Sequence, residues 1–342
     1  MASEISTIPD LDDCPDPEDR TTLPPRGRHR LPDPEPGPWS ARPRLLAAIA
    51  LVIAVVAGGL ALLIPAVSGR PGEPVREQAG EKGAPSGSGA SKQDDQKPEP
   101  RTLTAAPVTM EFDGFLSWAL IDAEGQLAGS DNSAETTWVG SVVKTWIVSD
   151  YLRRRAEQGK EPGPNRLAQA RRAIRDSNDP AADALYQAGG GAAQLRRMIS
   201  ICGLTETTIE GSRWRSVRMS ARDAARLGRC VTDGRAAGPS WTKWVRAELT
   251  KVRGSIAKAD QPSGGRWGII DGLPPDLLAD GVGMTNGWIV VKSEKEWQVN
   301  CLGVTDQWSL AVLTRYPAER GLRYGAEACA KVTAQLVSPK TS

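Results

Sequence analysis

The chain has 342 residues, with 43 Lys and Arg against 41 Asp and Glu, and a formal net charge of +2. A charge this close to neutral gives no reason to expect nucleic acid as a partner. The single histidine, His29, lies in a proline-rich stretch. The sequence therefore excludes a Ser-His-Asp triad and a histidine zinc site, and we predict no metal and no cofactor.

The first 104 residues fall into three segments of different composition. Residues 1–44 combine many prolines with charged side chains and show no apolar periodicity, which is typical of a disordered tail. Residues 45–67 carry no charge and, at about 1.5 Å per residue, are long enough to cross a hydrocarbon layer of ~30 Å as a transmembrane helix. Residues 68–104 are rich in Gly, Pro, Ser and charged side chains, which predicts a flexible linker with a root-mean-square span of about 35 Å.

The charges beside the apolar segment predict its orientation. Five arginines lie shortly before it, and three cations follow it: Arg26, Arg28, Arg30, Arg42 and Arg44, then Arg70, Arg76 and Lys82. The excess on the N-terminal side favours a cytoplasmic tail. We therefore predict a single-pass protein of the cell membrane whose C-terminal domain, residues 105–338, lies outside the cytoplasm.

The domain at 105–338 has strand patterns near both ends and helical patterns between them. Alternating apolar residues predict strands at 115–122, 288–292, 297–304 and 308–316. Helical periodicity predicts helices at 141–158, 166–174, 181–188, 192–201, 220–230, 240–249 and 322–336. Ser220 and Asp223 have the spacing of a capping box at one helix start. This order predicts a mixed α/β fold, with an antiparallel sheet, a terminal helix and an inserted helical lobe.

The cysteines agree with an oxidising environment for the domain. Four of the five lie in it, whereas Cys14 lies alone in the tail. An even number predicts two disulfides, with buried free thiols as the alternative, and three pairings are possible. We predict Cys202–Cys230, which would join two helix ends, and Cys301–Cys329, which would join a strand to the helix that covers the sheet.

The first candidate for chemistry is Ser141, three residues before Lys144 at the start of a predicted helix. Positions i and i+3 share a helix face, so the hydroxyl and the amine can approach each other. Without a histidine, a partly desolvated lysine is a plausible base for a serine nucleophile. On its own the Ser-x-x-Lys spacing is common, and a helix cap followed by a solvated lysine is its more usual explanation.

Two further motifs follow in order. Ser177, Asn178 and Asp179 lie in a break between two helices, and Thr285, Asn286, Gly287 and Trp288 lead into a strand. Taken separately, the first is also typical of a turn and helix cap, and the second of a strand start that contains glycine.

Together the three motifs resemble those of the penicillin-recognising serine enzymes, that is, class A β-lactamases and penicillin-binding D,D-peptidases, over residues 105–338. The sequences TNGW, WQVNCLGV and WSLAVLTRYP are more narrowly similar to membrane-anchored β-lactamase-like serine hydrolases of high-GC Gram-positive bacteria. The resemblance implies a β-lactamase/transpeptidase-like fold.

The resemblance also implies site roles. The nucleophile would be Ser141 and its base Lys144, while Ser177 would pass a proton to the leaving group. Asp179 would replace the family's Asn, with Asn178 between them. The backbone N–H groups of Ser141 and Trp288 would form the oxyanion hole, and Thr285, Asn286 and Gly287 would line the substrate site.

Three departures from the family pattern bear on activity. Thr285 replaces a lysine, which removes a cation near the substrate carboxylate. The second motif reads S-N-D instead of S-D-N. The loop expected to carry a deacylating Glu, residues 211–223, has no acid before Asp223, while Glu206 and Glu210 lie upstream. Arginines in this loop could bind a carboxylate or simply be solvated: Arg213, Arg215 and Arg218.

We therefore expect a membrane-anchored serine hydrolase or acyltransferase that acts on a cell-wall peptide or a β-lactam-like amide, with penicillinase the least expected activity. The alternative is a catalytically silent domain that binds cell-wall peptide or a protein partner. Thr285 favours the alternative, and the Ser141–Lys144 pair favours the enzyme. The sequence gives no oligomeric state.

The predicted topology can be tested with protease on intact cells. Because the linker at 68–104 should lie outside the membrane, added protease should release the C-terminal domain and leave residues 1–44 protected. Immunoblots against tags at the two ends measure this. Loss of the N-terminal tag from intact cells would reverse the orientation.

Overall fold

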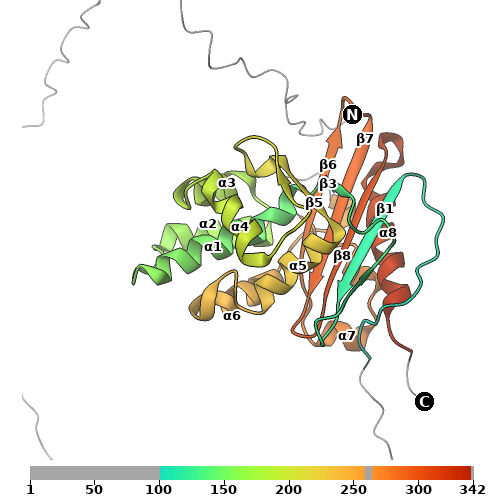
Figure 1. The fold of residues 1–342 in the computed structure, drawn as a ribbon, viewed down its shortest axis with the longest axis horizontal. Helices are drawn as coiled ribbons and strands as arrows, with labels where there is room; N and C mark the ends of the chain where they lie inside the picture. Colours follow the sequence, from blue (N-terminus) through green and yellow to red (C-terminus); the bar gives the residue numbers. More distant parts are fainter. Residues whose placement is uncertain (1–100, 259–263, 340–342) are drawn as a thin grey trace, which may run out of the picture. The chain divides into compact units, whose positions relative to one another are not determined.

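The computed structural model describes residues 101–258 and 264–339, which contain a sheet covered by helices on both faces (Figure 1). The predicted tail, transmembrane segment and most of the linker lie outside these residues. Within the described residues, no helix combines the length and the apolar character needed to cross a membrane.

The main sheet has five strands in the order β2-β1-β8-β7-β6, and every neighbouring pair is antiparallel. Its strands are β1 (Phe115–Ile121), β2 (Leu127–Gly129), β6 (Gly283–Val291), β7 (Glu296–Val304) and β8 (Ser309–Pro317). The order places β6 at an edge. The first and last parts of the chain thus pair with each other, as the predicted mixed α/β fold requires, and that prediction is confirmed.

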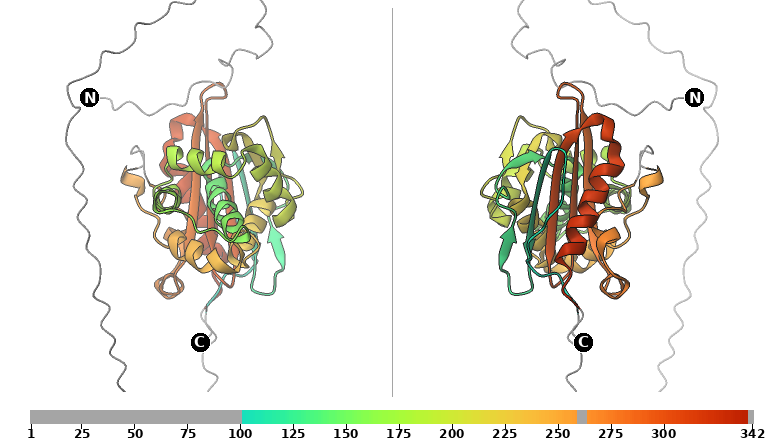
Figure 2. Two further views of the ribbon diagram at one scale, coloured as in Figure 1. Left: turned by 90° about the vertical axis from the view of Figure 1, so that its left-hand side faces the viewer. Right: turned by 90° about the vertical axis from the view of Figure 1, so that its right-hand side faces the viewer.

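A helical lobe is inserted between β1 and β6, on one side of the sheet (Figure 2). It contains α1 (Lys144–Glu157), α2 (Pro164–Arg175), α3 (Asp179–Ala188), α4 (Ala192–Cys202), α5 (Ala221–Thr232) and α6 (Gly238–Leu249). Helix α5 packs closely on the sheet, because a Cβ at Gly228 would lie 2.2 Å from Ser309 Oγ. The short α7 (Pro275–Ala279) precedes β6.

The C-terminal α8 (Gly321–Leu336) covers the opposite face of the sheet. It buries Ala326, Cys329, Val332 and Leu336 on one stripe. Leu103 is 1% exposed and bridges Val337, so the fold also includes residues just before the predicted start at 105.

Two features differ from the sequence prediction. Strand β6 begins at Gly283 instead of 288, because pairing with β7 extends it beyond its apolar run. A small sheet in the order β3-β5-β4 was not predicted: β3 (Thr136–Trp138), β4 (Thr208–Ile209) and β5 (Val217–Ser220). Strands of two to four residues are too short to show periodicity.

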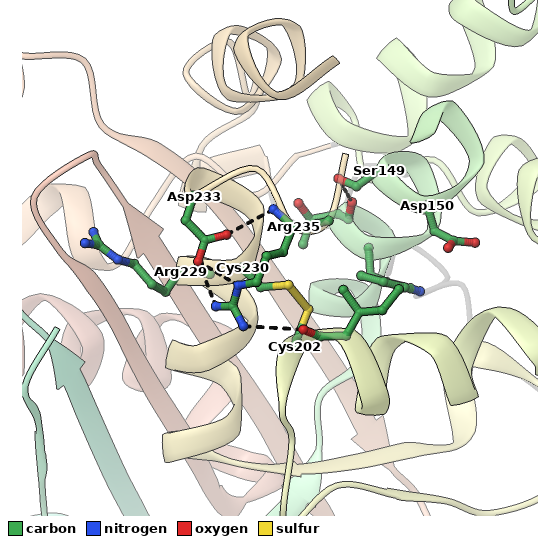
Figure 3. Close-up of a disulfide and its surroundings, with 12 residues drawn as sticks. Ser149, Asp150, Cys202, Arg229, Cys230, Asp233 and Arg235 are labelled. Atoms are coloured by element: carbon green, nitrogen blue, oxygen red, sulfur yellow. Dashed lines mark hydrogen bonds and ion pairs between the residues drawn. A yellow bond between two sulfur atoms is a disulfide. The ribbon is translucent and has the colours of Figure 1, made fainter. Parts of the chain in front are cut away.

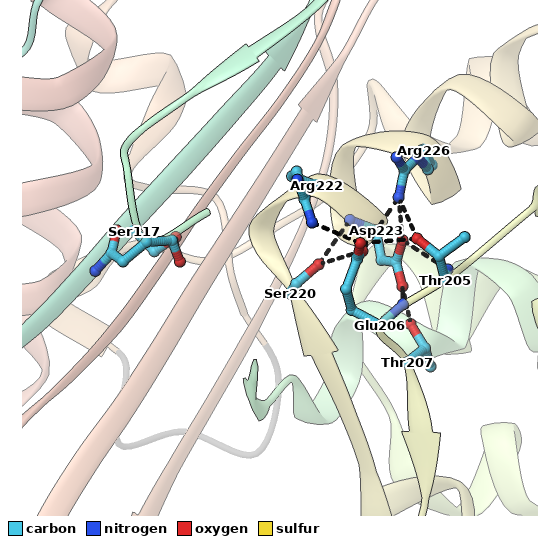
Figure 4. Close-up of polar contacts among 9 residues, drawn as sticks. Ser117, Thr205, Glu206, Thr207, Ser220, Arg222, Asp223 and Arg226 are labelled. Carbon is cyan, nitrogen blue, oxygen red and sulfur yellow. Dashed lines mark hydrogen bonds and ion pairs between the residues drawn. The ribbon is translucent and has the colours of Figure 1, made fainter. Parts of the chain in front are cut away.

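The start of α5 is held by a polar cluster (Figure 4). Ser220 Oγ accepts from the Asp223 backbone N–H, which is one half of the predicted capping box. The buried Asp223 carboxylate does not complete the box. It accepts from the backbone of Thr205 and Glu206, and from Thr207 Oγ1. Asp223 therefore joins the chain after α4 to the start of α5.

Both predicted disulfides are present. Cys202–Cys230 joins the end of α4 to α5 (Figure 3), and Cys301–Cys329 joins β7 to α8. The first lies near the ion pair of Arg235 with Asp233, and Arg235 also donates to the Ile201 carbonyl. The first disulfide thus links two helices of the lobe, and the second links the sheet to the helix that covers it.

Removing the first disulfide should destabilise the domain. In the chain-entropy account, closing a loop of 28 residues contributes roughly 3–4 kcal/mol. We expect Cys230→Ser, paired with Cys202→Ser to avoid a free thiol, to lower the free energy of unfolding by about that amount in urea titrations of the full chain. Cys14→Ser is the control and should leave it unchanged. An unchanged midpoint in the double variant would show that the cross-link contributes nothing.

Candidate active site

Ser141 lies in a 3₁₀ turn, η1 (Gly140–Val143), that leads directly into α1. Gly140 has a φ of 53°, a left-handed conformation that glycine adopts without strain. The turn presses against edge strand β6, since a Cβ at Gly287 would lie 2.1 Å from the Val139 carbonyl oxygen and 3.0 Å from Ser141 N. A side chain at Gly287 would thus push the candidate nucleophile away from the sheet.

The two backbone groups predicted for an oxyanion hole belong to these neighbouring segments. A Cβ at Gly140 would lie 3.9 Å from Trp288 N and 3.8 Å from the Gly287 Cα. The structure therefore brings the first and third motifs together along β6. Trp288 is half-buried and packs edge-on against Trp267, with ring centroids 5.5 Å apart.

Lys144 is the first residue of α1, and its side chain is only 2% exposed. Its Nζ donates to the Ser177 carbonyl oxygen, to Ser177 Oγ at 3.0 Å, and to the Asp179 carboxylate. Among the described residues, no hydrogen bond joins Lys144 to Ser141. The second motif therefore meets the lysine of the first, and the nucleophile stays outside this network in the resting structure.

Burial is the main influence on the Lys144 ammonium group. It lowers the pKa of Lys144 from 10.5 to about 8, against the opposing effect of the adjacent Asp179 carboxylate. For Asp179, burial favours the neutral form, but the neighbouring Lys144 and Arg215 outweigh it and hold the pKa of Asp179 below its usual value. At pH 7 about one Lys144 side chain in ten is then neutral and able to accept a proton.

The backbone of the second motif is shaped for this contact. Ser177 has a φ of 51°, an uncommon conformation for a residue with a side chain, and it presents both of its oxygens to Lys144. Asn178 caps α3, since its side-chain oxygen accepts from Ala181 N at 2.9 Å. The helix-cap interpretation therefore holds for Asn178, while Ser177 and Asp179 face the lysine.

The loop after α4 supplies two side chains whose contacts the sequence did not predict. The Trp214 ring lies 5.2 Å from Lys144 Nζ, and Arg215 binds Asp179 at 3.0 Å and Asp183 at 3.1 Å. The Arg215 guanidinium also stacks on Trp214 at 4.2 Å. Arg215 is thus neither solvated nor free for an outside carboxylate. The only signal in the sequence was the run of arginines beside a tryptophan.

The other two arginines of this loop differ from Arg215. Arg218 stacks on Trp138 at 5.0 Å and lies 3.8 Å from the Glu210 carboxylate. Arg213 is exposed.

The candidate deacylating acids lie outside this network. Glu206 is bound by Ser220, Arg222 and Arg226 at the start of α5 (Figure 4). Although burial opposes ionisation, hydrogen bonding with Asp223, Thr205 and Ser220 and the charge of Arg222 lower the pKa of Glu206 to about 2. In the described chain, the carboxylates that act on Lys144 are those of Asp179 and Asp183, and both carry ion pairs with Arg215.

Thr285 and Asn286 point to opposite faces of β6. Thr285 pairs with Leu302 and borders a narrow, mostly apolar gap beside Thr145, on the side of the helical lobe. Asn286 pairs with Cys301, on the α8 side, where it is 2% exposed and donates to the carbonyls of Gly265 and Trp267. Of these two third-motif side chains, Thr285 faces the lobe that holds Lys144, and Asn286 does not.

A second Ser-x-x-Lys sequence shows what the fold adds to the motif. Ser240 and Lys243 lie near the start of α6 with the spacing of Ser141 and Lys144, and both are exposed. The same sequence pattern therefore occurs in a buried, ion-paired setting at Ser141 and on the surface at Ser240, and it recurs at Ser255 and Lys258.

No family model and no curated protein sequence matches this chain. Solved structures do match its fold. A β-lactamase from Desulfarculus baarsii DSM 2075 is 17% identical, with a TM-score of 0.50 over 65% of this chain and 91% of that one. A mutant of the class A β-lactamase of the last common ancestor of Gram-negative bacteria is 18% identical, with a TM-score of 0.51 over 65% and 92%.

A structure of PBP-A is 14% identical, with a TM-score of 0.50 over 66% of this chain and 91% of that one. At these identities the likeness establishes the fold. The predicted β-lactamase/transpeptidase-like architecture is confirmed.

Replacing Asp179 should change the ionisation of Lys144. The carboxylate raises the pKa of Lys144, so Asp179→Asn should bring it below 8. If acylation of Ser141 requires neutral Lys144, labelling by an acylating probe rises with pH, and its midpoint should move to lower pH in this variant. Rates of labelling from pH 5 to 10 measure the midpoint. Asp233→Asn, at the end of α5, is the control and should keep the wild-type pH profile. A D179N profile that coincides with the wild-type profile would contradict the assignment of Lys144 as the base.

Proposed function

We propose that this chain is a membrane-anchored, extracytoplasmic serine acyl-transfer enzyme, with a cell-wall peptide of the acyl-D-Ala type or a related amide as its substrate. The observation that carries the proposal is Lys144, a buried amine with a pKa of about 8 at the start of the helix that bears Ser141. The fold shared with β-lactamases and PBP-A supports it. The membrane location rests on the charge-free segment at 45–67.

The mechanism begins with the neutral fraction of Lys144. Neutral Lys144 takes the Ser141 proton while Ser141 Oγ bonds to the substrate carbonyl carbon. The carbonyl oxygen becomes an oxyanion beside the backbone N–H groups of Ser141 and Trp288. When the carbon–nitrogen bond breaks, Ser177, 3.0 Å from Lys144 Nζ, passes the proton on to the departing amine. The product is an ester of Ser141. The Ser141–Lys144 contact closes only with substrate, as is common for catalytic hydrogen bonds.

Deacylation should be slow. Activation of water needs a carboxylate free to accept a proton, and the two beside Lys144 are both engaged in salt bridges with Arg215. This favours a long-lived ester, or transfer of the acyl group to an amine acceptor, over rapid penicillin hydrolysis.

A second function, a silent domain that binds peptide or protein without chemistry, is favoured by two observations. Thr285 supplies no charge to the site, and the hydrogen bonds of Lys144 all go to the second motif and none to Ser141. The two proposals differ in one outcome, since only the enzyme forms a covalent bond to Ser141.

Covalent labelling distinguishes them. We expect a fluorescent penicillin to label the full chain in isolated membranes, and Ser141→Ala and Lys144→Ala to reduce the rate at least 100-fold, within the range seen when a general base is removed. The matched controls are Ser240→Ala and Lys243→Ala, which alter an exposed copy of the motif and should label like the wild type. Labelling that survives in S141A, or no labelling of the wild-type chain by any acylating probe, would reject the nucleophile.

A cation at position 285 should accelerate this acylation. Two unit charges about 4 Å apart attract by about 1 kcal/mol in water and about 4 kcal/mol at an effective dielectric constant of 20, which corresponds to roughly tenfold to a thousandfold in rate. Thr285→Lys should therefore increase the rate of Ser141 acylation by a carboxylate-bearing β-lactam, and much less by a neutral ester. Timed labelling with both probes measures the ratio. Equal acceleration of both, or of neither, would show that Thr285 does not face the substrate carboxylate.

A further inference from the structure

A polar cavity lies in the helical lobe, at the opposite end of α1 from Ser141. It has a volume of about 370 Å³ and is lined by Tyr151, Arg154, Arg155, Gln158, Arg166 and the glycine turn at 188–190. Ten helical residues separate Lys144 from Arg154, or about 15 Å along the axis. The cavity is therefore separate from the candidate active site.

The charges in this cavity are all positive. Three guanidinium groups line it, and none of its lining residues is acidic. The acids nearest along the chain are Asp150, Glu157 and Glu161. Asp150 is buried and already bound to Arg153 and Arg197, both at 2.5 Å. Glu157 and Glu161 are exposed, and Glu157 is bound to Arg153 at 2.6 Å. Three like charges around one space repel each other unless an anion lies between them.

The arginines have unused hydrogen-bonding capacity. Among the described residues, the Arg154 guanidinium has no hydrogen-bond partner, and Nε of Arg155 is buried without an acceptor. Buried donors without a partner are uncommon in native proteins, and a bound ligand is one explanation for them. Arg155 is held through one other nitrogen, since its Nη2 donates to the Glu161 carbonyl at 3.1 Å. Arg166 is fixed by Gln169 and by the Ala184 carbonyl, both at 3.0 Å. The site thus combines one anchored guanidinium with two that have donors to spare.

We propose that this cavity binds a phosphate-bearing ligand. Guanidinium groups form paired, charge-assisted hydrogen bonds with phosphate oxygens, and a phosphate group carries close to two negative charges at neutral pH. The neutral donors of Tyr151 and Gln158 extend the polar lining beyond the arginines. The volume falls in the range of small-molecule sites and leaves space for more than one phosphate. The ligand is either a polyphosphate-type group or a single phosphate on a polyol, such as a lipid headgroup or polymer unit.

Calorimetric titration of the full chain in uncharged detergent, at constant ionic strength, tests this site. The probes are inorganic pyrophosphate and glycerol 3-phosphate. We expect at least one to bind, and Arg154→Gln to weaken that binding roughly ten- to a hundredfold, as loss of a charge-assisted hydrogen bond does. In the part of the chain that the structure describes, the Arg154 side chain forms no hydrogen bond, so this change should not disturb folding. Arg155→Gln should act in the same direction.

The control is Arg323→Gln, on the exposed side of α8, where the arginine lies 4.0 Å from Glu327. It should bind the probes as the wild type does. Tighter binding of pyrophosphate points to a polyphosphate-type ligand, and tighter binding of glycerol 3-phosphate to a headgroup or polymer unit; both outcomes support the site. Absence of binding by both probes at millimolar concentration would overturn the proposal, as would equal affinities in wild type and R154Q, or an equal loss in R323Q.

Discussion

The ion pair between buried Lys144 and Asp179 is the constraint on which the candidate site depends. It holds the start of α1 against the break between α2 and α3, and Arg215 extends it to the loop after α4. Burying an ammonium group is costly unless it is paired and fully hydrogen-bonded, and here Ser177 supplies the remaining acceptors. Because the pKa of Lys144 is about 8 instead of 10.5, the unfolded chain binds more protons between these values. This group therefore makes the fold more stable as the pH rises through that window.

The same network explains how the site could acylate without rapid turnover. Asp179 keeps most Lys144 charged, which offsets part of the cost of burying the ammonium group, and leaves a minority of neutral lysine to act as a base. Arg215 in turn forms ion pairs with both Asp179 and Asp183. The loop after α4 thus contributes a cation and the ring of Trp214 to the neighbourhood of Lys144, in place of an acid that could activate water.

Much of this arrangement could be predicted from local patterns. The main strands, the helical insertion and both disulfides follow from periodicity and from the positions of the cysteines on the predicted helices and strand. The order of the three motifs predicted that residues far apart in the sequence would meet, and the fold brings Ser141, Lys144, Ser177 and Gly287 into one region.

Contacts that depend on loop conformation could not be predicted. The loop arginines looked alike in the sequence, yet Arg215 pairs with two carboxylates while Arg213 is exposed. Asn286 resembled a substrate-facing residue, but strand alternation places its side chain on the α8 side.

We propose that Lys144 is a buried amine that acts as a base, and its ionisation can be measured directly. NMR titration of the full chain with isotope-labelled lysine, in uncharged detergent, would follow its ammonium signal. The signal is assigned by its loss in Lys144→Met, with exposed Lys243 as the internal reference. The account predicts a midpoint of about 8 for Lys144, well below that of an exposed lysine. A midpoint near the ordinary value of 10.5 would contradict it.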